Sequence, residues 1–336
     1  MERFDPVAEF SGGSETIKLV SLPIIFWNMT EYQLLVFDSG NTCFSYSSKR
    51  IPLILLLRTV YHIVRDVSSK NGNNYENYEK YNGFVVLHGT DTMAYTASAL
   101  SFILRGLNKP VILTGSQIPL SEIRSDGRDN LITSILIASE GVANEVSLYF
   151  SGRLLRGNRA MKMSADGLVA FKSPNYPLLA EVGIEIKYNK STILKHKEGT
   201  ELEYLPFSEV PIGVLKVFPG IQFGLFEEIM TEKLSGIVLE TFGAGNIPGG
   251  GNELLPIIKK AFAAGSVITV CSQCPAGTVT LGAYETSSSL KVAGAVSGKD
   301  MTTEAAVAKL YHLFSLGLSK EEIKKLMEKN IAGELT

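Results

Sequence analysis

The sequence predicts an α/β protein of two domains, a larger N-terminal one and a smaller C-terminal one, with mainly parallel sheets flanked by helices. From residue 81 onward, short apolar strands alternate with helical patterns, and this alternation is typical of βαβ units. It is interrupted between about residues 172 and 211 by a stretch rich in Pro, Lys, Glu and Asn. Domain boundaries lie in such polar stretches. We therefore expect the N-terminal domain over 61–205 and the C-terminal domain over 211–336.

The first sixty residues differ from the rest of the chain. Their β-leaning run to Phe37 and the apolar block Ile51–Val67 do not join into βα units. Residues 1–60 therefore form an atypical N-terminal region whose fold the pattern leaves open.

The other elements follow in order along the two domains. Each predicted strand is a short apolar run, and a helical segment begins directly after Thr92. Ser319 and Glu322 have the spacing of a capping box at the start of the last helix. The remaining expected strands are Gly83–Leu87, Pro110–Gly115, Val146–Phe150, Gly213–Val217, Gly236–Glu240 and Val267–Val270, and the remaining helices are Asp129–Ser139, Glu253–Ala264 and Thr303–Phe314.

The composition excludes several classes of protein. The formal net charge is −2 and the 32 basic residues are not gathered into a stripe, which disfavours nucleic-acid binding. No apolar signal segment follows Met1, and the apolar run Ile51–Leu57 is too short to span a membrane. Three cysteines make a poor disulfide framework, so we expect a reducing, cytoplasmic setting.

The turn His88-Gly89-Thr90-Asp91-Thr92 nominates a site. It joins the strand Gly83–Leu87 to a helix, so its hydroxyls and carboxylate lie at a strand's carboxyl end and a helix's amino end. Open α/β sheets bind ligands there, and helix N–H groups favour anions. A hydroxyl beside a carboxylate can act as a nucleophile or orient a water when a base is near. The alternative is ordinary helix capping, although one such residue would be enough for a cap.

Lys162 is the candidate base. It ends the segment Arg156-Gly157-Asn158-Arg159-Ala160-Met161-Lys162, which follows a strand. A lysine desolvated in a cleft can serve as a general base to a hydroxyl. A solvated loop lysine is the alternative.

Two further segments resemble a cofactor site and a metal site, but we expect neither a cofactor nor a metal. Gly243–Gly249 has the spacing GxGxxxG, and Pro248 interrupts it, so a tight strand-to-helix turn is favoured over a dinucleotide site. Cys271-Ser272-Gln273-Cys274 is a lone CxxC, and the four histidines show no ligand spacing.

With these residues in view, the sequence resembles the asparaginase family, specifically its cytoplasmic type I branch. The matching segments run in family order from about Tyr81 onward, and the segment around Thr90 is the most specific. They are His88–Tyr95, Ile112–Pro119, Asp126–Asn130, Arg156–Arg159, Glu240–Asn246 and Asp300–Ala306.

The resemblance implies hydrolysis of L-asparagine to L-aspartate and ammonia without a cofactor. It implies that Lys162 activates Thr90 and an associated water, while Asp91 also holds the substrate α-ammonium. It further implies a homodimer or homotetramer in which Asn246 approaches a neighbouring subunit's site. The implied substrate-binding residues are Gly89, Thr90, Asp91, Ser116 and Asn246.

Two departures from the family pattern bear on activity and regulation. The family's Thr-Gly-Gly-Thr-Ile loop, whose first threonine is the acyl-accepting nucleophile, is not found. The most similar segment is Ser11-Gly12-Gly13-Ser14. It is either a chance match or a loop in which Ser11 takes the place of the threonine. Asp38–Asn41, the candidate carboxylate-binding loop, lies too far upstream. An altered splice product or a faulty gene model would give this pattern. Met161 replaces a threonine of the family's allosteric asparagine site near Cys274, which puts cooperative regulation in doubt.

The predicted function is thus an asparaginase-type amidohydrolase with L-asparagine and a second copy of itself as partners, and with no nucleic-acid or membrane partner. One alternative is a catalytically silent homologue that binds asparagine or assembles with active subunits. Two others are a nicotinamide-dependent oxidoreductase built on Gly243–Gly249 and an amidotransferase subunit that shares the same motifs.

Overall fold

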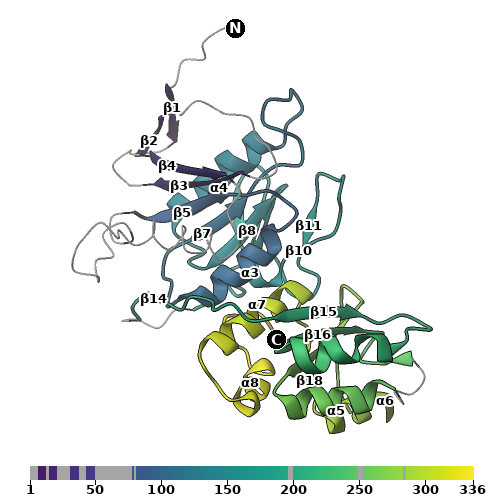
Figure 1. Ribbon diagram of the computed structural model, residues 1–336. Coiled ribbons are helices and arrows are strands. Elements are labelled where there is room, and N and C mark those ends of the chain that lie inside the picture. Colours follow the sequence, from purple (N-terminus) through teal and green to yellow (C-terminus); the bar gives the residue numbers. More distant parts are fainter. Residues whose placement is uncertain are drawn as a thin grey trace. The chain divides into compact units, whose positions relative to one another are not determined.

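The computed structural model describes residues 7–12, 15–20, 31–37, 43–49, 78, 81–195, 200–248, 253–282 and 285–336, with the backbone alone for 7–49 and for 285 and 286. The chain divides into two compact units (Figure 1). Unit 1 comprises Met1–Leu100, Gly106–Lys172 and Pro177–Tyr204, and unit 2 comprises Ser101–Arg105, Ser173–Tyr176 and Leu205–Thr336. Both units contain sheets and helices, so the predicted two-domain α/β fold is confirmed.

Unit 1 is built on an eight-stranded mixed sheet with the order β13-β12-β9-β8-β7-β5-β3-β4. The central strands β5, β7 and β8 are parallel, and the strands on either side of them pair antiparallel. The strands are β3 (Glu31–Phe37), β4 (Cys43–Lys49), β5 (Gly83–Leu87), β7 (Val111–Thr114), β8 (Val146–Phe150), β9 (Arg153–Arg156), β12 (Ala180–Val182) and β13 (Ile186–Tyr188).

The central strands are buried because they are apolar along their whole length. Every residue of β5, β7 and β8 is buried, as expected for parallel strands covered on both faces. The helix α4 (Gly127–Glu140) packs against all three strands and ends at Gly141, which has a φ of 61°. The helix α3 (Met93–Ile103) follows β5 directly.

The chain also contains short strands and a turn outside this sheet. The hairpin of β1 and β2 pairs Ser11 with Thr16, and β10 pairs antiparallel with β11. The bounds are β1 (Val7–Gly12), β2 (Glu15–Val20), β6 (Leu104–Arg105), β10 (Met161–Lys162), β11 (Phe171–Lys172), β14 (Glu203–Tyr204) and η1 (Gly157–Arg159).

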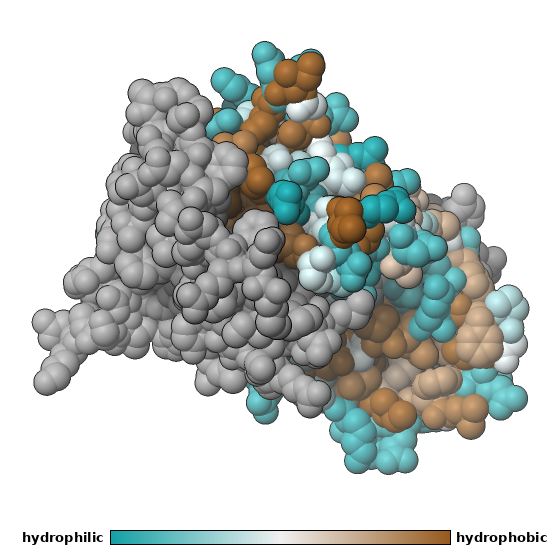
Figure 2. All heavy atoms as spheres, turned by 90° about the horizontal axis from the view of Figure 1, so that it is seen from above, coloured by the Kyte–Doolittle hydropathy of each residue, from teal (hydrophilic) through white to brown (hydrophobic). Residues whose placement is uncertain are grey.

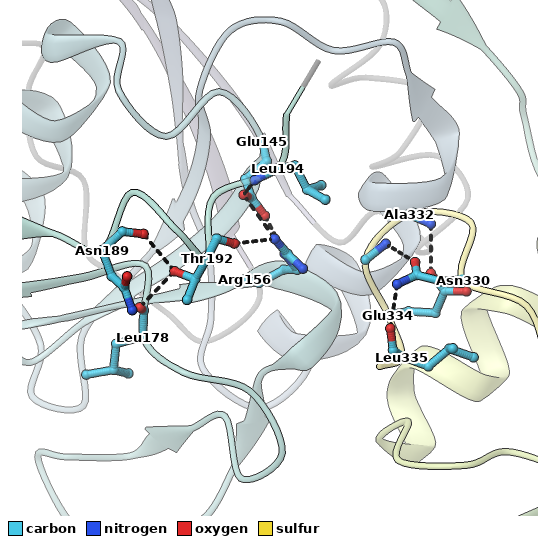
Figure 3. Close-up of polar contacts among 11 residues, drawn as sticks. Glu145, Arg156, Leu178, Asn189, Thr192, Leu194, Asn330, Ala332, Glu334 and Leu335 are labelled. Atoms are coloured by element: carbon cyan, nitrogen blue, oxygen red, sulfur yellow. Dashed lines mark hydrogen bonds and ion pairs between the residues drawn. The ribbon is translucent and has the colours of Figure 1, made fainter. Parts of the chain in front are cut away.

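A buried ion pair beside β9 holds the segment after β13 within unit 1 (Figure 3). Arg156 Nε lies 2.6 Å from Glu145 Oε2, and the two side chains are 4% and 3% exposed. Arg156 Nη2 also donates to the carbonyl of Thr192 at 2.6 Å, and Glu145 Oε1 accepts from the N–H of Leu194 at 2.8 Å. The part of the polar stretch that contains Thr192 and Leu194 is therefore held within unit 1 by specific hydrogen bonds.

Unit 2 is built on a parallel sheet with the order β15-β16-β17-β18. Successive residues of β16 point to opposite faces: Ile237 and Leu239 join the apolar cluster that includes α5, and Val238 joins the cluster that includes α7 and α8. The strands are β15 (Ile212–Lys216), β16 (Gly236–Thr241), β17 (Val267–Ser272) and β18 (Val296–Ser297), and the helices are η2 (Phe223–Phe226), η3 (Ile229–Lys233), α5 (Leu254–Ala264), α6 (Glu285–Ala293), α7 (Thr303–Ser315) and α8 (Lys320–Met327).

Two local predictions in unit 2 are confirmed. The capping box is present at α8, with Ser319 accepting from the N–H of Glu322 and Glu322 accepting from the N–H of Ser319. The glycine segment after β16 is a tight turn closed by a bridge between Phe242 and Asn246. Gly243 and Gly245 have φ values of 49° and 120° there, which glycine adopts without strain.

The surface carries apolar side chains among polar ones on the face that Figure 2 shows. Ile123 and Ile184 are the most exposed large apolar side chains among the described residues. Single exposed apolar residues are common on soluble proteins and nominate no site by themselves. Among the helices of the described ranges, none has both the length and the apolar character that a membrane crossing requires.

Candidate active site

Two turns lie side by side at the carboxyl edge of the unit 1 sheet. The first turn, residues 88–92, follows β5, and the second, residues 115–119, follows β7. The parallel register pairs Leu87 with Thr114, and the N–H of His88 donates to the carbonyl of Thr114 at 2.8 Å. The side chains of both turns therefore meet where open α/β sheets bind their ligands.

Thr90, Asp91 and Lys162 are brought together at this edge. Lys162 Nζ lies 2.8 Å from Thr90 Oγ1 and 2.7 Å from Asp91 Oδ1, although Lys162 is 72 residues beyond Thr90 in the chain. The Lys162 side chain is only 18% exposed, whereas that of Asp91 is 73% exposed. Because an ammonium group can only donate, the Thr90 oxygen is the acceptor. Lys162 is thus not a solvated loop lysine.

The Thr90 hydroxyl has a second partner, Gln117, which was not among the predicted site residues. Thr90 Oγ1 donates to Gln117 Oε1 at 3.0 Å, and Thr90 itself is buried. This hydroxyl donates to the Gln117 side chain and accepts from the Lys162 side chain, so helix capping does not account for it. Gln117 lies in the turn three positions after the end of β7, and β7 is the strand next to β5. The rule that ligands bind at strand ends, applied to both strands, would have found it.

Asp126 and Asn130 hold the second turn in place. The Asp126 carboxylate accepts from the N–H of Gln117 at 3.1 Å and from that of Ile118 at 3.0 Å. Asn130 Nδ2 donates to the carbonyl of Gly115 at 3.0 Å and to Asp126 Oδ2 at 3.2 Å. The segment Asp126–Asn130, which matched the family by resemblance, therefore supports the turn that carries Gln117.

His88 holds the first turn and stays neutral. Its Nδ1 lies 2.6 Å from the carbonyl of Gly89 and its Nε2 lies 2.8 Å from Thr96 Oγ1 on α3. A carbonyl can only accept, so Nδ1 carries the hydrogen and Nε2 accepts from the threonine. Burial lowers the pKa of His88 to about 4, against the opposing effect of the Gly89 carbonyl. His88 is therefore a neutral link between the turn and α3 at pH 7.

Gly115 allows the two turns to approach each other. A Cβ atom at this position would lie 2.2 Å from the carbonyl oxygen of His88, well inside van der Waals contact. Only glycine fits, because the obstacle is backbone and cannot rotate away.

The other predicted site residues lie in several parts of the chain. Gly89 and Ser116 are half-buried in the two turns of unit 1. Asn246 closes the tight turn after β16, and Cys274 is exposed beyond β17 in unit 2. Their roles in substrate binding and regulation stay predictions.

The N-terminal candidates are not tested. Ser11 lies in β1, and its side chain is outside the described part of the structure. Asp38–Asn41 lies outside the described residues altogether. Among the side chains that are described, no group of three or more His, Cys, Asp or Glu residues could hold a metal ion.

A buried hydroxyl that accepts from a lysine, where the lysine is itself paired with a carboxylate at the carboxyl edge of parallel strands, is typical of one class of protein: hydrolases that use a hydroxyl activated by a base. Comparison with known proteins narrows the class. Residues 66–194 match the family model "Asparaginase, N-terminal", and residues 211–327 match the model "Glutaminase/Asparaginase C-terminal domain".

Individual relatives agree with the family models. L-asparaginase 1 of Escherichia coli K12 is 45% identical over 275 residues, which cover 82% of this chain and 79% of that protein. The human 60 kDa lysophospholipase is 45% identical over 260 residues, covering 77% of this chain and 45% of that protein. The crystal structure of L-asparaginase I from Vibrio cholerae has a TM-score of 0.74 at 43% identity and covers 84% of this chain and 81% of that one.

The chain belongs to the asparaginase family. The predicted family with its type I branch and the predicted enzyme class, an amidohydrolase, are confirmed.

Proposed function

We propose that this protein hydrolyses L-asparagine to L-aspartate and ammonia, with Thr90, Lys162 and Asp91 as its catalytic group. The observation that carries the proposal is the placement of Lys162 Nζ, 2.8 Å from Thr90 Oγ1 and 2.7 Å from Asp91 Oδ1. Relatives named L-asparaginase, at 45% and 43% identity, support this substrate over the other amides that such a site could accept.

The three side chains have complementary roles in this reaction. Lys162, when neutral, takes the proton of the Thr90 hydroxyl, and the Thr90 oxygen attacks the carboxamide carbon to form an acyl-enzyme. If Ser11 accepts the acyl group instead, Lys162 and Thr90 activate the water that hydrolyses that acyl-enzyme. Asp91, at 2.7 Å, stabilises the ammonium that Lys162 then carries. The proton passes to the departing nitrogen, and water completes the hydrolysis. The largely exposed Asp91 carboxylate is also available to the substrate α-ammonium.

The remaining predicted residues are assigned around this group. Gly89 and Ser116 contribute to the substrate site from the two turns, and Asn246 contributes from a neighbouring subunit of a homo-oligomer. Cys274 belongs to an allosteric region. Ser11 is the candidate for the acyl-accepting nucleophile that the family places in its N-terminal loop.

Ammonia release from L-asparagine by the purified protein tests the proposal. Thr90→Val and Lys162→Met should each lower kcat by about 10²-fold or more, because general acid–base groups contribute on this scale. Lys187→Met is the matched control, since Lys187 is an exposed lysine of β13, and should leave kcat unchanged.

Each outcome decides a different part of the proposal. If the folded parent protein binds asparagine but releases no ammonia, it is the catalytically silent homologue, and the proposed enzymatic function is wrong. Activity that survives Thr90→Val would overturn the site. Ser11→Ala should reduce activity only if Ser11 replaces the family's threonine. L-glutamine as a second substrate measures the amide preference.

A further inference from the structure

The side chain of Gln117 uses all of its hydrogen-bonding groups at the active site. Its Oε1 accepts from Thr90 Oγ1 at 3.0 Å. Its Nε2 donates to the carbonyl of Ala165 at 3.2 Å and to that of Gly167 at 3.1 Å. Because carbonyl oxygens cannot donate, the nitrogen must face them, and this settles which end of the amide faces Thr90.

The two groups that Gln117 connects belong to the two halves of the catalytic group. Thr90 lies in the turn after β5, and Ala165 and Gly167 lie in the loop 163–170 that begins directly after Lys162. That loop is itself ordered by Ser164, whose hydroxyl accepts from the N–H of Gly167 at 2.8 Å. Gln117 therefore joins the segment that carries the hydroxyl to the segment that carries the base.

Gln117 is itself held by its own backbone. Its N–H donates to both oxygens of Asp126 at 3.1 Å. The backbone of Gln117 is anchored and its side-chain amide has three partners. It therefore loses little further conformational freedom when it restrains Thr90. Gln117 thus has the rigidity that a positioning residue needs.

We infer that Gln117 is a positioning residue for the reaction, an inference that rests on the proposed function. It keeps the oxygen of Thr90 within reach of Lys162 by bridging Thr90 to the loop after Lys162. The Thr90 proton points to Gln117 at rest and reaches Lys162 by rotation about the Cβ–Oγ1 bond, which moves no heavy atom. The three hydrogen bonds of the Gln117 amide go to Thr90 and to the loop after Lys162, so it acts on kcat through Thr90.

Gln117→Met tests this role because methionine has nearly the same length and no amide. We expect kcat for L-asparagine to fall about tenfold, the scale of a lost hydrogen bond combined with a displaced catalytic group, while KM changes less than about twofold. A rise in KM with an unchanged kcat would show that Gln117 binds substrate and would overturn the inference.

Gln273→Met is the matched control. Gln273 Nε2 also donates to two main-chain carbonyls, those of Val217 at 2.6 Å and Glu240 at 2.9 Å, but in unit 2. Both variants should lower the thermal midpoint to a similar extent, and only Gln117→Met should lower kcat. An equal effect of the two variants on kcat would reduce Gln117 to an ordinary structural contact and would overturn the inference.

A double variant distinguishes action through Thr90 from general loosening of the loop. If Gln117 acts through the Thr90 hydroxyl, Gln117→Met adds no further loss of kcat in the Thr90→Val background. Losses that multiply would contradict the inference, because they would show that Gln117 acts independently of Thr90.

A measurement without turnover separates this inference from the proposed function. The side-chain NH₂ signal of Gln117 in ¹⁵N NMR can be assigned by its loss in Gln117→Met. Both of its protons should exchange slowly, since both are donated to carbonyls. An inactive parent with slow exchange means that the proposed function has failed while the placement of Gln117 holds. Fast exchange overturns the placement whatever the activity.

Discussion

The buried ion pair of Lys309 and Glu334 in unit 2 allows a quantitative prediction for Glu334→Gln. Both side chains are 0% exposed, and Lys309 Nζ lies 2.6 Å from Glu334 Oε1. Figure 3 shows the Glu334 carboxylate inside the turn 330–335, where it accepts from the N–H of Ala332 at 2.7 Å. Lys309 also donates to the carbonyl of Met327 at 3.0 Å and to that of Lys329 at 2.5 Å.

The magnitude follows from what the substitution leaves behind. Removing one member of a buried ion pair typically costs about 3–5 kcal/mol, because the other charge stays buried without compensation. Burial lowers the pKa of Lys309 and Glu334 opposes this shift, so without Glu334 the lysine releases its proton more readily. The two remaining carbonyl acceptors and this deprotonation limit the loss, and we expect about 3 kcal/mol in the free energy of unfolding.

Urea unfolding at pH 7 measures this loss. The matched control is Glu227→Gln, which breaks the Lys260–Glu227 pair, whose side chains are 59% and 43% exposed. Such surface pairs contribute at most about 1 kcal/mol. The double variant Lys309→Met with Glu334→Gln should recover most of the stability, since it leaves no buried charge. Equal losses for Glu334→Gln and Glu227→Gln would refute the reasoning, as would a double variant less stable than Glu334→Gln alone.

Two further predictions concern pH and backbone approach. Burial, with a smaller effect from Arg105, lowers the pKa of His312 from its ordinary value of 6.5 to about 4. The unfolded chain therefore binds more protons between these values, and stability falls as pH drops through this window. The free energy of unfolding, measured with urea, should therefore decline from pH 7 to pH 5 by about 2 kcal/mol less in His312→Leu than in the parent. Equal declines in the two proteins would contradict this prediction. Gly115→Ala should lower asparagine hydrolysis by at least about tenfold, because its Cβ would meet the His88 carbonyl at 2.2 Å and displace the Thr90 turn. The control is Gly183→Ala, where a Cβ meets nothing within 4 Å. Equal activity in the two variants would show that a Cβ at position 115 does not displace the Thr90 turn.

Much of the fold could be predicted because it depends on local patterns. The strands Gly83–Leu87 and Val146–Phe150 have the predicted limits, since a continuous apolar run is typical of a strand buried on both faces. The hairpin of β12 and β13 was not predicted, because Glu181, Glu185 and Lys187 are exposed there. Such polar strands lack the alternation of apolar residues by which sequence patterns are recognised.

The candidate site shows the same division between local and distant information. The sequence by itself determined that Thr90 and Asp91 follow a buried strand, because the residues that form strand, turn and helix are adjacent in the chain. It also determined the family through segments in a fixed order. Only the tertiary structure decided that Lys162 and Gln117 meet the Thr90 hydroxyl. Those contacts depend on the parallel pairing of β5 with β7 and on a loop more than seventy residues away, and no local propensity specifies such distances.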